Sequence, residues 1–315
     1  MVSSLVILGA SGFLGKCLIA AGNFPMPIKA LARIIPSDID ITQEGVTWIQ
    51  VDLLNIKSLN EALAPGDVVI NLAYMSGTSK AENICLIDNI IEACLYSKVA
   101  RLVHCSTAVV VGATMSSRVI ESTPCEPLTP YEQTKWALEQ RVLGALSKGL
   151  DVSILRPTAI IGHGGKNLLK LAKSLKSGSR VASYFRASLY GKRPMHLVPV
   201  CNVAAALLHL AIFPEALNGN VYIVSSDDDP INNFEGIEEI LLHSLGQKPR
   251  SLPLLPLPKL LLSLLLRLLG RSETSITRIY DSDKLLSTNF KPVDSVFKAV
   301  TDFSDAFKNN VSRDS

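Results

Sequence analysis

Tyr131 and Lys135 are a pair whose types and spacing could do chemistry. They stand four positions apart in the run Tyr-Glu-Gln-Thr-Lys, inside a segment of helix-forming composition. Residues four apart share one face of a helix, so the ammonium would lie beside the phenol and favour its ionised form. Opposite charges ~4 Å apart at an effective dielectric of ~20 attract by roughly 4 kcal/mol, which is worth about three pKa units. The pair predicts a phenol that exchanges protons near neutrality.

A glycine-rich turn near the start of the chain could hold a phosphate. Gly9, Gly12 and Gly15 follow directly on the apolar run Leu5-Val6-Ile7-Leu8. A strand that enters such a turn lets backbone N–H groups approach a pyrophosphate, and the helix that follows adds a favourable dipole. The spacing alone also fits an ordinary strand-to-helix turn. Combined with the tyrosine and lysine, it predicts hydride chemistry at a nicotinamide, with the tyrosine handling the proton.

Further short motifs follow these two in a fixed order along the chain. They are Asp52, Asn71-Leu72-Ala73, His104-Cys105-Ser106-Thr107 and Leu155-Arg156-Pro157. In this order and at these spacings the whole set resembles the extended short-chain dehydrogenase/reductase superfamily, the NAD-dependent epimerase/dehydratase family. The resemblance runs through nearly the whole chain. It implies an α/β fold, a doubly wound parallel (Rossmann) sheet with a smaller C-terminal α/β substrate domain.

The pattern of elements agrees with this fold. Apolar runs of strand length alternate with helix-forming segments through the first half of the chain, which favours βαβ units and a parallel sheet. The expected strands are 5–8, 28–32, 47–51, 68–71, 102–105 and 152–155, and the expected helices are 13–21, 58–63, 81–98 and 131–147. The loop 112–130, rich in Ser, Thr and Pro, is expected to form a lid.

After Pro157 the alternation weakens and pieces of a smaller domain follow. Helices are expected at 167–176, 234–245 and 260–269, and a strand at 221–224. The segment 197–211 resembles the strand and helix with which the family returns to its first domain. We therefore expect an NAD(P)-binding Rossmann domain over 1–165, with 195–213 returning to it, and a substrate-binding part over 166–315.

The resemblance assigns the catalytic roles. Thr107 matches the substrate-facing Ser or Thr of the family, and Ser106 is the adjacent alternative. A hydroxyl there would polarise the substrate oxygen while Tyr131 supplies or removes the proton. Lys135 would lower the pKa of the phenol and bond the nicotinamide ribose.

The resemblance also implies the cofactor contacts. These are Gly9, Ser11, Gly12, Phe13, Leu14, Gly15, Arg33, Asp52, Leu53, Leu72, Ala73, Asn83, Tyr131, Lys135 and Pro157. Asp52 would accept from the adenine amine, with a helix or turn cap as the alternative. Asn83 matches an asparagine at the start of a helix, and it could also be the N-cap of that helix.

The end of the second expected strand bears on the choice of cofactor. An acidic residue there would bind the adenosine ribose 2′-hydroxyl, whereas a positive residue accommodates a 2′-phosphate. The sequence reads Ala30-Leu31-Ala32-Arg33, with no acidic residue before Asp38. Arg33 therefore favours NADP, with NAD as the alternative. A solvent-facing arginine without a ligand is the other interpretation of this residue.

Departures from the family pattern bear on the substrate. Ala108 and Val109 stand where sugar 4,6-dehydratases carry an Asp-Glu pair, so dehydration is not expected. The residues that depart from the nucleotide-sugar pattern are Ala159, Met195 and Asn202, while Asn167 and Arg193 are candidates for a diphosphate site. The small-molecule substrate expected first is still a nucleotide sugar.

The favoured function is an NADP(H)-preferring oxidoreductase that reduces or oxidises a keto or hydroxyl carbon. The alternatives are a nucleotide-sugar epimerase that retains NAD, a steroid- or flavonol-type dehydrogenase/reductase, and a non-catalytic NADP-binding regulator. The intact Tyr131/Lys135 pair argues against the regulator, because a sensor needs the glycine turn but no proton donor. The Leu-rich segment near Leu260 would suit an apolar ligand.

Composition excludes other classes. The chain has 315 residues, 48% of them hydrophobic, and a net charge of +3, without the dense basic patch of a nucleic-acid binder. Its six cysteines form no Cys-x-x-Cys pair and no metal-ligand cluster, which indicates reduced thiols, a cytoplasmic location and no metal. His104, His163 and His196 have no partner at triad or metal spacing and are expected to be structural.

No membrane-spanning segment is expected. The start of the chain lacks a positive n-region and does not resemble a signal peptide. The most apolar stretch, 259–269, is far shorter than the ~20 residues needed to span a bilayer. It is interpreted as a helix over the substrate cleft or at a subunit contact, with an interfacial membrane helix as the alternative. Helices 81–98 and 131–147 resemble those of the family's dimer contact, which leaves a homodimer open.

Overall fold

The computed structural model describes residues 4–311, except 23, 38–42, 178–183, 185–187, 189 and 248–276. The chain forms two compact units, each built from three segments. Unit 1 comprises Met1–Val110, Thr129–Arg156 and Ala204–Tyr222. Unit 2 comprises Val111–Leu128, Pro157–Val203 and Ile223–Ser315.

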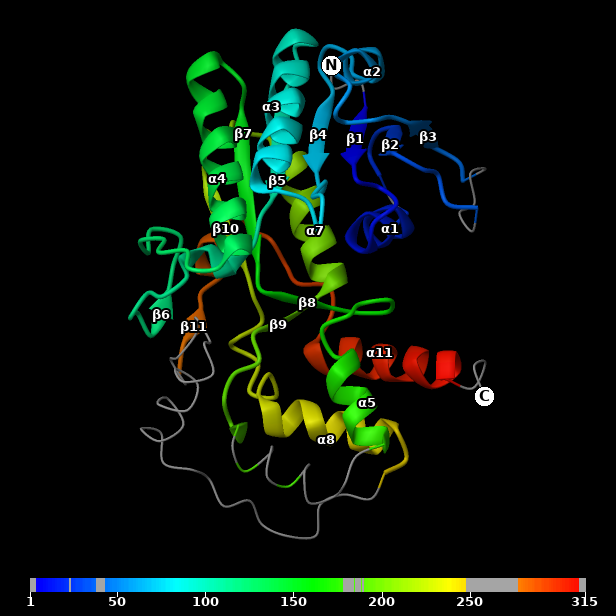
Figure 1. The fold of residues 1–315 in the computed structure, drawn as a ribbon, viewed down its shortest axis with the longest axis vertical. Coiled ribbons are helices and arrows are strands. Elements are labelled where there is room, and N and C mark those ends of the chain that lie inside the picture. Colours follow the sequence, from blue (N-terminus) through cyan, green and yellow to red (C-terminus); the bar gives the residue numbers. More distant parts are fainter. Residues whose placement is uncertain are drawn as a thin grey trace. The chain divides into compact units, whose positions relative to one another are not determined.

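A seven-stranded sheet is the framework of the fold (Figure 1). Its strands are β1 (Leu5–Leu8), β2 (Ile28–Ala32), β3 (Val46–Gln50), β4 (Val68–Asn71), β5 (Arg101–Cys105), β7 (Val152–Pro157) and β10 (Val221–Val224), in the order β10-β7-β5-β4-β1-β2-β3. The neighbouring pairs from β7 to β3 run parallel. All four residues of β1 are fully buried, because helices cover both faces of a parallel sheet and its central strands become continuous apolar runs.

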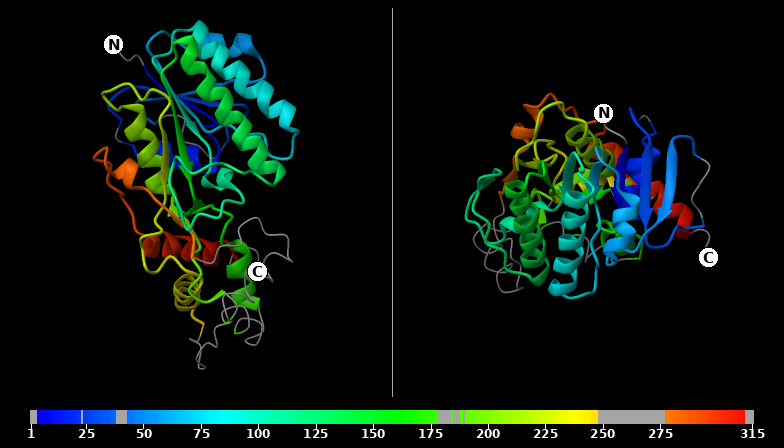
Figure 2. Two further views of the ribbon diagram at one scale, coloured as in Figure 1. Left: turned by 90° about the vertical axis from the view of Figure 1, so that its left-hand side faces the viewer. Right: turned by 90° about the horizontal axis from the view of Figure 1, so that it is seen from above.

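Helices lie on both faces of this sheet. Those of the first part of the chain are α1 (Phe13–Ala20), α2 (Ile56–Ala62), α3 (Lys80–Tyr96) and α4 (Pro130–Gly144), and α7 (Val200–Ala211) comes later. Short 3₁₀ helices η1 (Ala108–Val111) and η2 (Ala145–Lys148) follow β5 and α4. Figure 2 shows α3 and α4 side by side on one face and α7 on the other. The predicted doubly wound parallel sheet is confirmed.

Capping boxes set where α3 and α4 begin. The Ser79 and Thr129 side chains accept from the backbone N–H groups of Glu82 and Glu132, whose carboxylates accept in return from the cap residues. This arrangement satisfies N–H groups that have no partner inside the helix. Proline then occupies the first turn of α4, where its missing N–H costs nothing. Tyr131 is therefore held in the first turn of α4.

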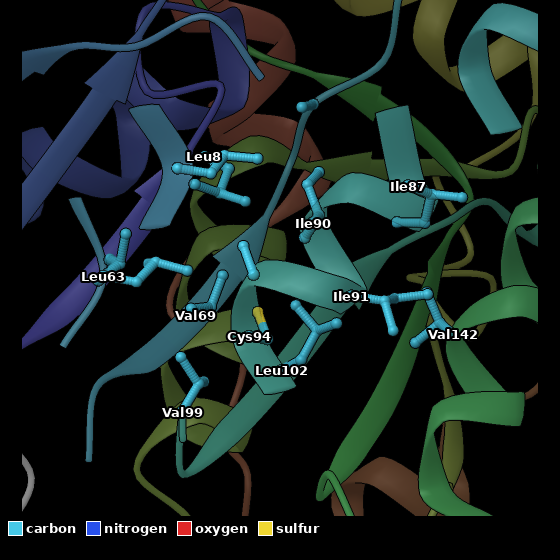
Figure 3. Packing of buried hydrophobic residues seen from close by; sticks show 14 of the residues in the cluster. Leu8, Leu63, Val69, Ile87, Ile90, Ile91, Cys94, Val99, Leu102 and Val142 are labelled. Carbon is cyan, nitrogen blue, oxygen red and sulfur yellow. The ribbon is translucent and has the colours of Figure 1, made fainter. Parts of the chain in front are cut away.

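The main hydrophobic core lies between the sheet and the α2–α3–α4 layer (Figure 3). Val69 and Leu102 from the sheet meet Ile87, Ile90 and Ile91 of α3, all of them buried. Helix α3 supplies this contact because its apolar residues recur every three or four positions. This packing holds α3 and α4 in place against the sheet.

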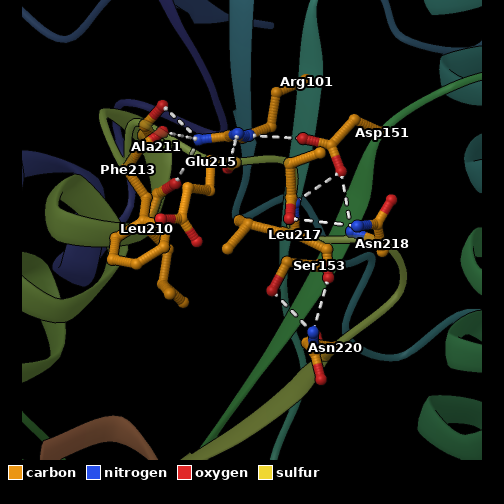
Figure 4. A network of polar contacts seen from close by, with 11 residues as sticks. Arg101, Asp151, Ser153, Leu210, Ala211, Phe213, Glu215, Leu217, Asn218 and Asn220 are labelled. Atoms are coloured by element: carbon orange, nitrogen blue, oxygen red, sulfur yellow. Dashed lines mark hydrogen bonds and ion pairs between the residues drawn. The ribbon is translucent and has the colours of Figure 1, made fainter. Parts of the chain in front are cut away.

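A buried arginine joins the three segments of unit 1 (Figure 4). The Arg101 guanidinium donates to the carbonyl oxygens of Leu210, Phe213 and Glu215, which follow or end α7. Its Nε pairs with Asp151 at 2.7 Å. The Asp151 carboxylate in turn accepts two backbone N–H bonds from the third segment. The Arg101–Asp151 pair thus provides hydrogen-bond partners for the carbonyl groups at the end of α7 and for the N–H groups of the turn that follows it.

Unit 2 is built from short strands and helices. Two parallel pairs, β8 (Ala159–Ile161) with β9 (Leu197–Pro199) and β6 (Arg118–Val119) with β11 (Ile279–Tyr280), accompany α5 (Leu169–Ser177), α8 (Phe234–Ser244), α10 (Asp283–Leu286) and α11 (Val296–Val311). Its core is a second cluster in which Ile237 and Leu241 of α8 pack with Val300 and Phe303 of α11. The expected helix 260–269 lies outside the described residues.

The segment expected to be a lid is tied down within unit 2. Strand β6 pairs with β11, and Arg118 forms ion pairs with Asp281 and Asp283. The buried Arg278 guanidinium also donates to the carbonyl oxygen of Gly112 at 3.2 Å. The Ser, Thr and Pro content therefore marks a loop that contains a short strand and side-chain anchors, and its role as a lid stays a prediction.

None of the six cysteines, all of which lie among the described residues, forms a disulfide bond. In the part of the chain that the structure describes, no helix has both the length and the apolar character needed to cross a membrane.

Candidate active site

The glycine turn after β1 requires glycine at its first and last positions. Gly9 has a φ of +80°, and a Cβ there would lie 3.1 Å from the backbone nitrogen of Ala73. A Cβ on Gly15 would lie 2.5 Å from the carbonyl oxygen of Ala10. The turn therefore brings β1, β4 and α1 closer together than any side chain would allow.

The same turn presents uncapped backbone N–H groups. Gly12 is the N-cap of α1, so no side chain satisfies the first N–H groups of that helix. Ser11 and Phe13 are half-buried beside it, and Leu14 is buried against the core. Free N–H groups at a helix N-terminus attract anions. These residues fit the pyrophosphate of a dinucleotide, as the sequence predicts.

The remaining cofactor candidates lie at the ends of neighbouring strands. Arg33 follows β2 and is exposed. Leu72 and Ala73 follow β4, where the Leu72 N–H donates to the Leu8 carbonyl and the Ala73 N–H donates to Asn71 Oδ1. Pro157 is the last residue of β7 and is buried. In a parallel sheet these ends share one edge, which is where such folds bind their ligands.

Asp52 caps a turn. Its Oδ1 accepts from the Leu54 N–H at 3.0 Å, and the side chain is exposed after β3. Leu53 is half-buried, and its carbonyl accepts from Asn89 of α3. The turn-cap interpretation of Asp52 therefore holds in the structure, while its contact with an adenine stays a prediction.

Asn83 has a different role from the cap considered for it. Ser79 is the N-cap of α3, so the N-cap interpretation of Asn83 is wrong. The fully buried Asn83 amide instead accepts from the Met75 N–H and donates to the carbonyls of Met75 and Ser79 and to the Thr78 hydroxyl. Because these bonds use both ends of the amide, Asn83 holds the loop 75–79, and its contact with a cofactor stays a prediction.

Tyr131, Thr107 and Lys135 come together in unit 1. The Thr107 hydroxyl hydrogen-bonds to the Tyr131 phenol, and Thr107 Oγ1 accepts from the Val109 N–H at 3.5 Å. Tyr131 is 44% exposed, whereas Lys135, one turn further along α4, is 6% exposed. The Lys135 ammonium donates to the Cys105 carbonyl oxygen at 3.4 Å. Ser106, the alternative to Thr107, is buried, and its hydroxyl has no hydrogen-bond partner among the described residues.

The ionisation of the phenol differs from the sequence expectation. Burial, followed by the neighbouring Tyr74 and Cys105, raises the pKa of Tyr131 to about 12, and only the Thr107 hydrogen bond lowers it. The Lys135 ammonium is directed to Cys105 and to the ring of Tyr74 instead of the phenol oxygen. Burial also lowers the pKa of Lys135. The expectation that Lys135 brings the phenol near neutrality is therefore wrong for this state of the protein, in which Tyr131 carries its proton.

A buried ion pair beneath α4 escaped the sequence analysis. Glu139 and Arg156 pair at 2.7 Å with almost no exposure, and the guanidinium lies 5.6 Å from the Trp136 ring centroid. The Glu139 carboxylate also raises the pKa of Lys135 against the effect of burial. The sequence did contain a signal for Glu139, because Tyr131, Lys135 and Glu139 follow one another at a spacing of four and so share one face of the helix.

Only one of the two ring nitrogens of His104 has a hydrogen-bond partner among the described residues, although a structural role was expected for this residue. Asn71 Oδ1 accepts from the Ala73 N–H, so the Asn71 amide donates to His104 Nδ1 at 3.0 Å. The ring proton then sits on Nε2, which has no partner among the described residues. Burial, with a smaller contribution from the Lys135 charge, lowers the pKa of His104 to about 3. The ring is therefore neutral.

The candidates for a diphosphate site lie in unit 2 and are engaged with the protein itself. The Asn167 amide donates to the Ile160 carbonyl at 2.7 Å, and the Arg193 guanidinium lies 6.0 Å from the Tyr190 ring centroid. Asn202 accepts from two backbone N–H groups and donates to the Asp294 carbonyl. Unit 2 also has a cavity of about 630 Å³, whose lining includes none of the predicted cofactor or catalytic residues.

Comparison with known proteins identifies the family of this chain. The 3-beta hydroxysteroid dehydrogenase/isomerase family matches residues 6–257. Short-chain dehydrogenase/reductase family 42E member 1 of Homo sapiens is 31% identical over 267 residues, which cover 74% of this chain and 65% of that protein. The chain thus spans slightly less than two thirds of this relative. A 2-alkyl-3-oxoalkanoate reductase of Stenotrophomonas maltophilia is 27% identical over 75% of this chain and 74% of its own length.

The fold is also that of known enzyme structures. The dTDP-glucose 4,6-dehydratase DesIV of Streptomyces venezuelae, solved as a double mutant with NAD and DAU bound, superposes with a TM-score of 0.72. The match covers 98% of each chain at 18% identity, so it concerns the fold alone.

Fold, glycine turn and Tyr/Lys pair together define an extended short-chain dehydrogenase/reductase, a class of NAD(P)-dependent oxidoreductases. Within that class the chain belongs to the 3-beta hydroxysteroid dehydrogenase/isomerase family. The predicted superfamily is confirmed, while NAD(P)-dependent activity of this chain stays a proposal, because the chain spans less than two thirds of the human relative.

Proposed function

We propose that this protein is an NADP(H)-preferring reductase of a ketone, with Thr107, Tyr131 and Lys135 as its catalytic residues. One observation carries the proposal: the hydroxyl of Thr107 hydrogen-bonds to a phenol that is protonated and partly exposed. A protonated phenol is a proton donor, which is what reduction of a carbonyl requires. The opposite direction would first need a base to remove that proton.

The residues act on the carbonyl oxygen. Bound nicotinamide supplies the hydride chemistry. Thr107 donates a hydrogen bond to the carbonyl oxygen, and Tyr131 gives its proton to that oxygen as negative charge develops there. Lys135 would bind the nicotinamide ribose. The N–H groups at the start of α1 hold the pyrophosphate.

For the substrate we favour an apolar ketone of steroid type over the nucleotide sugar first expected. Membership of the 3-beta hydroxysteroid dehydrogenase/isomerase family supports this choice. The Asn167 amide, a candidate for a diphosphate site, is bound to the Ile160 carbonyl. The nucleotide sugar is retained as an arm of the experiment, because Arg193 lies in unit 2 and could pair with a diphosphate.

Cofactor choice follows from Arg33. Its exposed guanidinium at the end of β2 could form an ion pair with a 2′-phosphate. We therefore expect NADPH to bind more tightly than NADH.

We also propose that residues 166–315 carry the substrate contacts, that α3 and α4 form a homodimer contact, and that the protein is cytoplasmic.

The first experiment measures turnover. Purified protein is assayed with NADPH against a steroid ketone, a short 3-oxo ester and a 4-keto nucleotide sugar. We expect turnover of the steroid ketone and its loss in Tyr131→Phe, which removes only the donor hydroxyl. That variant should still bind NADPH, measured by calorimetry. Near-normal turnover by Tyr131→Phe would refute the proton-donor role, and turnover of the sugar alone would replace the substrate proposed here.

The second experiment tests cofactor exchange. A reductase releases its cofactor at each turnover, so the purified protein should contain little nucleotide.

Arg33→Ala should bind NADPH roughly ten- to more than a hundredfold more weakly, as expected for the loss of a charge-assisted contact. Its affinity for NADH should not change. Stoichiometric NAD in the purified protein would instead favour a nucleotide-sugar epimerase.

A further inference from the structure

Tyr74 lies against both ionisable residues of the candidate active site, although no motif in the sequence marks it. It follows Ala73 at the carboxyl end of β4, and its half-buried ring packs against the core of unit 1. Lys135 Nζ lies 4.6 Å from its ring centroid. The Tyr131 ring meets it edge-to-face, with centroids 5.6 Å apart and an interplanar angle of 88°.

The contact with Lys135 can fix the direction of the ammonium. Lysine carries its charge on a flexible four-carbon stem, so ordering that stem costs entropy when a ligand binds. The hydrogen bond from Lys135 to the Cys105 carbonyl is long, at 3.4 Å. An aromatic face attracts a cation, and it does so more strongly where the cation is shielded from water, as Lys135 is. The Tyr74 face therefore orders the ammonium before a ligand arrives.

The contact with Tyr131 fixes the plane of the donor ring. Tyr131 is 44% exposed, so the core holds only part of its side chain. Edge-to-face contact is a preferred geometry for two aromatic rings. With the Thr107 hydrogen bond at the phenol oxygen, it defines both the plane and the direction of the hydroxyl.

We infer that Tyr74 is a positioning residue that preorganises Lys135 for the cofactor ribose and Tyr131 for proton donation. The inference rests on the proposed roles of these two residues. It uses the ring of Tyr74 and assigns no proton to its hydroxyl. A preformed site binds its ligand more tightly because less freedom is lost on binding.

The test is a double-mutant cycle on NADPH affinity, measured by calorimetry. Tyr74→Leu should weaken binding about two- to thirtyfold, the range expected for a cation–π contact from exposed to desolvated sites. In a Lys135→Met background the same change should alter affinity by less than about twofold, because its target is absent. Tyr74→Phe, which keeps the aromatic face, should restore most of the lost affinity.

Kinetics and a matched control separate positioning from folding. Tyr74→Leu should lower kcat about tenfold through the misplaced phenol while the KM for the ketone changes little. Met75→Leu is the control, because Met75 packs on the same core from the same loop. It should match wild type in kcat and affinity. Thermal unfolding of each variant shows whether its site is folded at the assay temperature.

Each outcome decides between the claims. Equal effects of Tyr74→Leu in both backgrounds, or tighter NADPH binding by this variant, would overturn the positioning role while leaving the proposed function intact. An inactive Tyr74→Phe would show that the hydroxyl matters and would also overturn it. Failure of the wild-type protein to bind NADPH or NADH would reject the proposed function, and this inference with it.

Discussion

At the scale of single residues, the protonation of Tyr131 decides which proton-transfer step the phenol is ready to perform. Its pKa of about 12 reflects burial and the neighbouring Tyr74 and Cys105, which outweigh the Thr107 hydrogen bond. The phenol is therefore protonated throughout the neutral range. A donor that is already protonated favours reduction, whereas oxidation depends on the small fraction of phenolate.

This protonation predicts different pH dependences for the two directions. Reduction should be nearly independent of pH from about 6 to 9, because the donor stays protonated. Oxidation of the product alcohol should rise by up to about tenfold per pH unit as the phenolate fraction grows. Initial rates at saturating cofactor measure both. A reduction rate that falls steeply near pH 7 would show that the phenol titrates there.

His104 should make stability depend on pH. Its pKa falls from 6.5 to about 3 on folding, so below pH 6.5 the unfolded chain takes up a proton that the folded protein refuses. Stability should therefore fall as the pH drops from about 6.5 towards 3, by up to about 1.4 kcal/mol per pH unit from this group. Urea unfolding measures the slope. His104→Gln should flatten it, and the exposed His163→Gln should leave it unchanged.

Spacing predicted the residues of the site better than their chemistry. Tyr131 and Lys135 could be found because helical geometry is regular, whereas Thr107, two residues after the end of β5, was assigned from the family resemblance. The direction of the Lys135 ammonium could not be predicted, because it depends on Cys105 and Tyr74, which come from other elements. Long-range contacts of this kind leave no periodic trace in a sequence.

At the scale of elements, the close approach of α1 to the sheet depends on Gly15. A Cβ there would lie 2.5 Å from the backbone of Ala10, which cannot rotate away. We expect Gly15→Ala to destabilise the protein by about 1–3 kcal/mol and to weaken NADPH binding by shifting the N–H groups of α1. Gly144→Ala in α4 meets no atom within 4 Å. It should stabilise by about 0.5–1 kcal/mol, so equal effects of the two changes would contradict the steric explanation.

The Glu139–Arg156 pair should hold α4 on the sheet. Removing one charge leaves the other buried without compensation, so Glu139→Gln should cost about 3–5 kcal/mol in the free energy of unfolding. Asp88→Asn is the control, because Asp88 and Arg141 form an exposed pair at 3.7 Å between α3 and α4. It should cost less than about 1 kcal/mol. Denaturant unfolding compares the variants, and a similar small loss for both would contradict the burial argument.

Elements of unit 1 could be predicted closely from the sequence. Strand β2 has the expected bounds, and α1, α3 and α4 begin within one residue of expectation. Buried strands, the glycine turn before α1 and the capping boxes of α3 and α4 are strong local signals. The loop 112–130 could not be foreseen in the same way. Its strand β6 pairs with a partner more than a hundred residues later, and neither strand is long enough to show alternation.

At the scale of the whole molecule, unit 1 is assembled from segments far apart in the chain. Its third segment, Ala204–Tyr222, follows residues that belong to unit 2. The family resemblance predicts a return at 195–213, of which residues 195–203 lie in unit 2 and residues 204–213 in this third segment. Local composition carries no signal for such a return. The substrate-binding role of 166–315 stays a proposal, because no described contact identifies a ligand there.

Arg101 should keep this third segment folded with the rest of unit 1. Its guanidinium meets carbonyl groups at the end of α7, and its partner Asp151 accepts from the N–H groups of Leu217 and Asn218. We expect Arg101→Met to leave Asp151 and these carbonyls without their charged partner and to cost about 3 kcal/mol or more. Arg118→Met, which removes a mostly exposed guanidinium from Asp281 and Asp283, should cost less than Arg101→Met.

Hydrogen exchange followed along the chain tests how far the effect reaches. In the wild-type protein the amides of residues 204–222 should exchange together with those of β5, because Arg101 lies on β5 and joins the two. In Arg101→Met the 204–222 amides should exchange faster than those of β5, since the segment can then open before the sheet does. Equal acceleration of both would mean that the pair stabilises the unit globally, and unchanged protection of 204–222 would show that other contacts hold the segment.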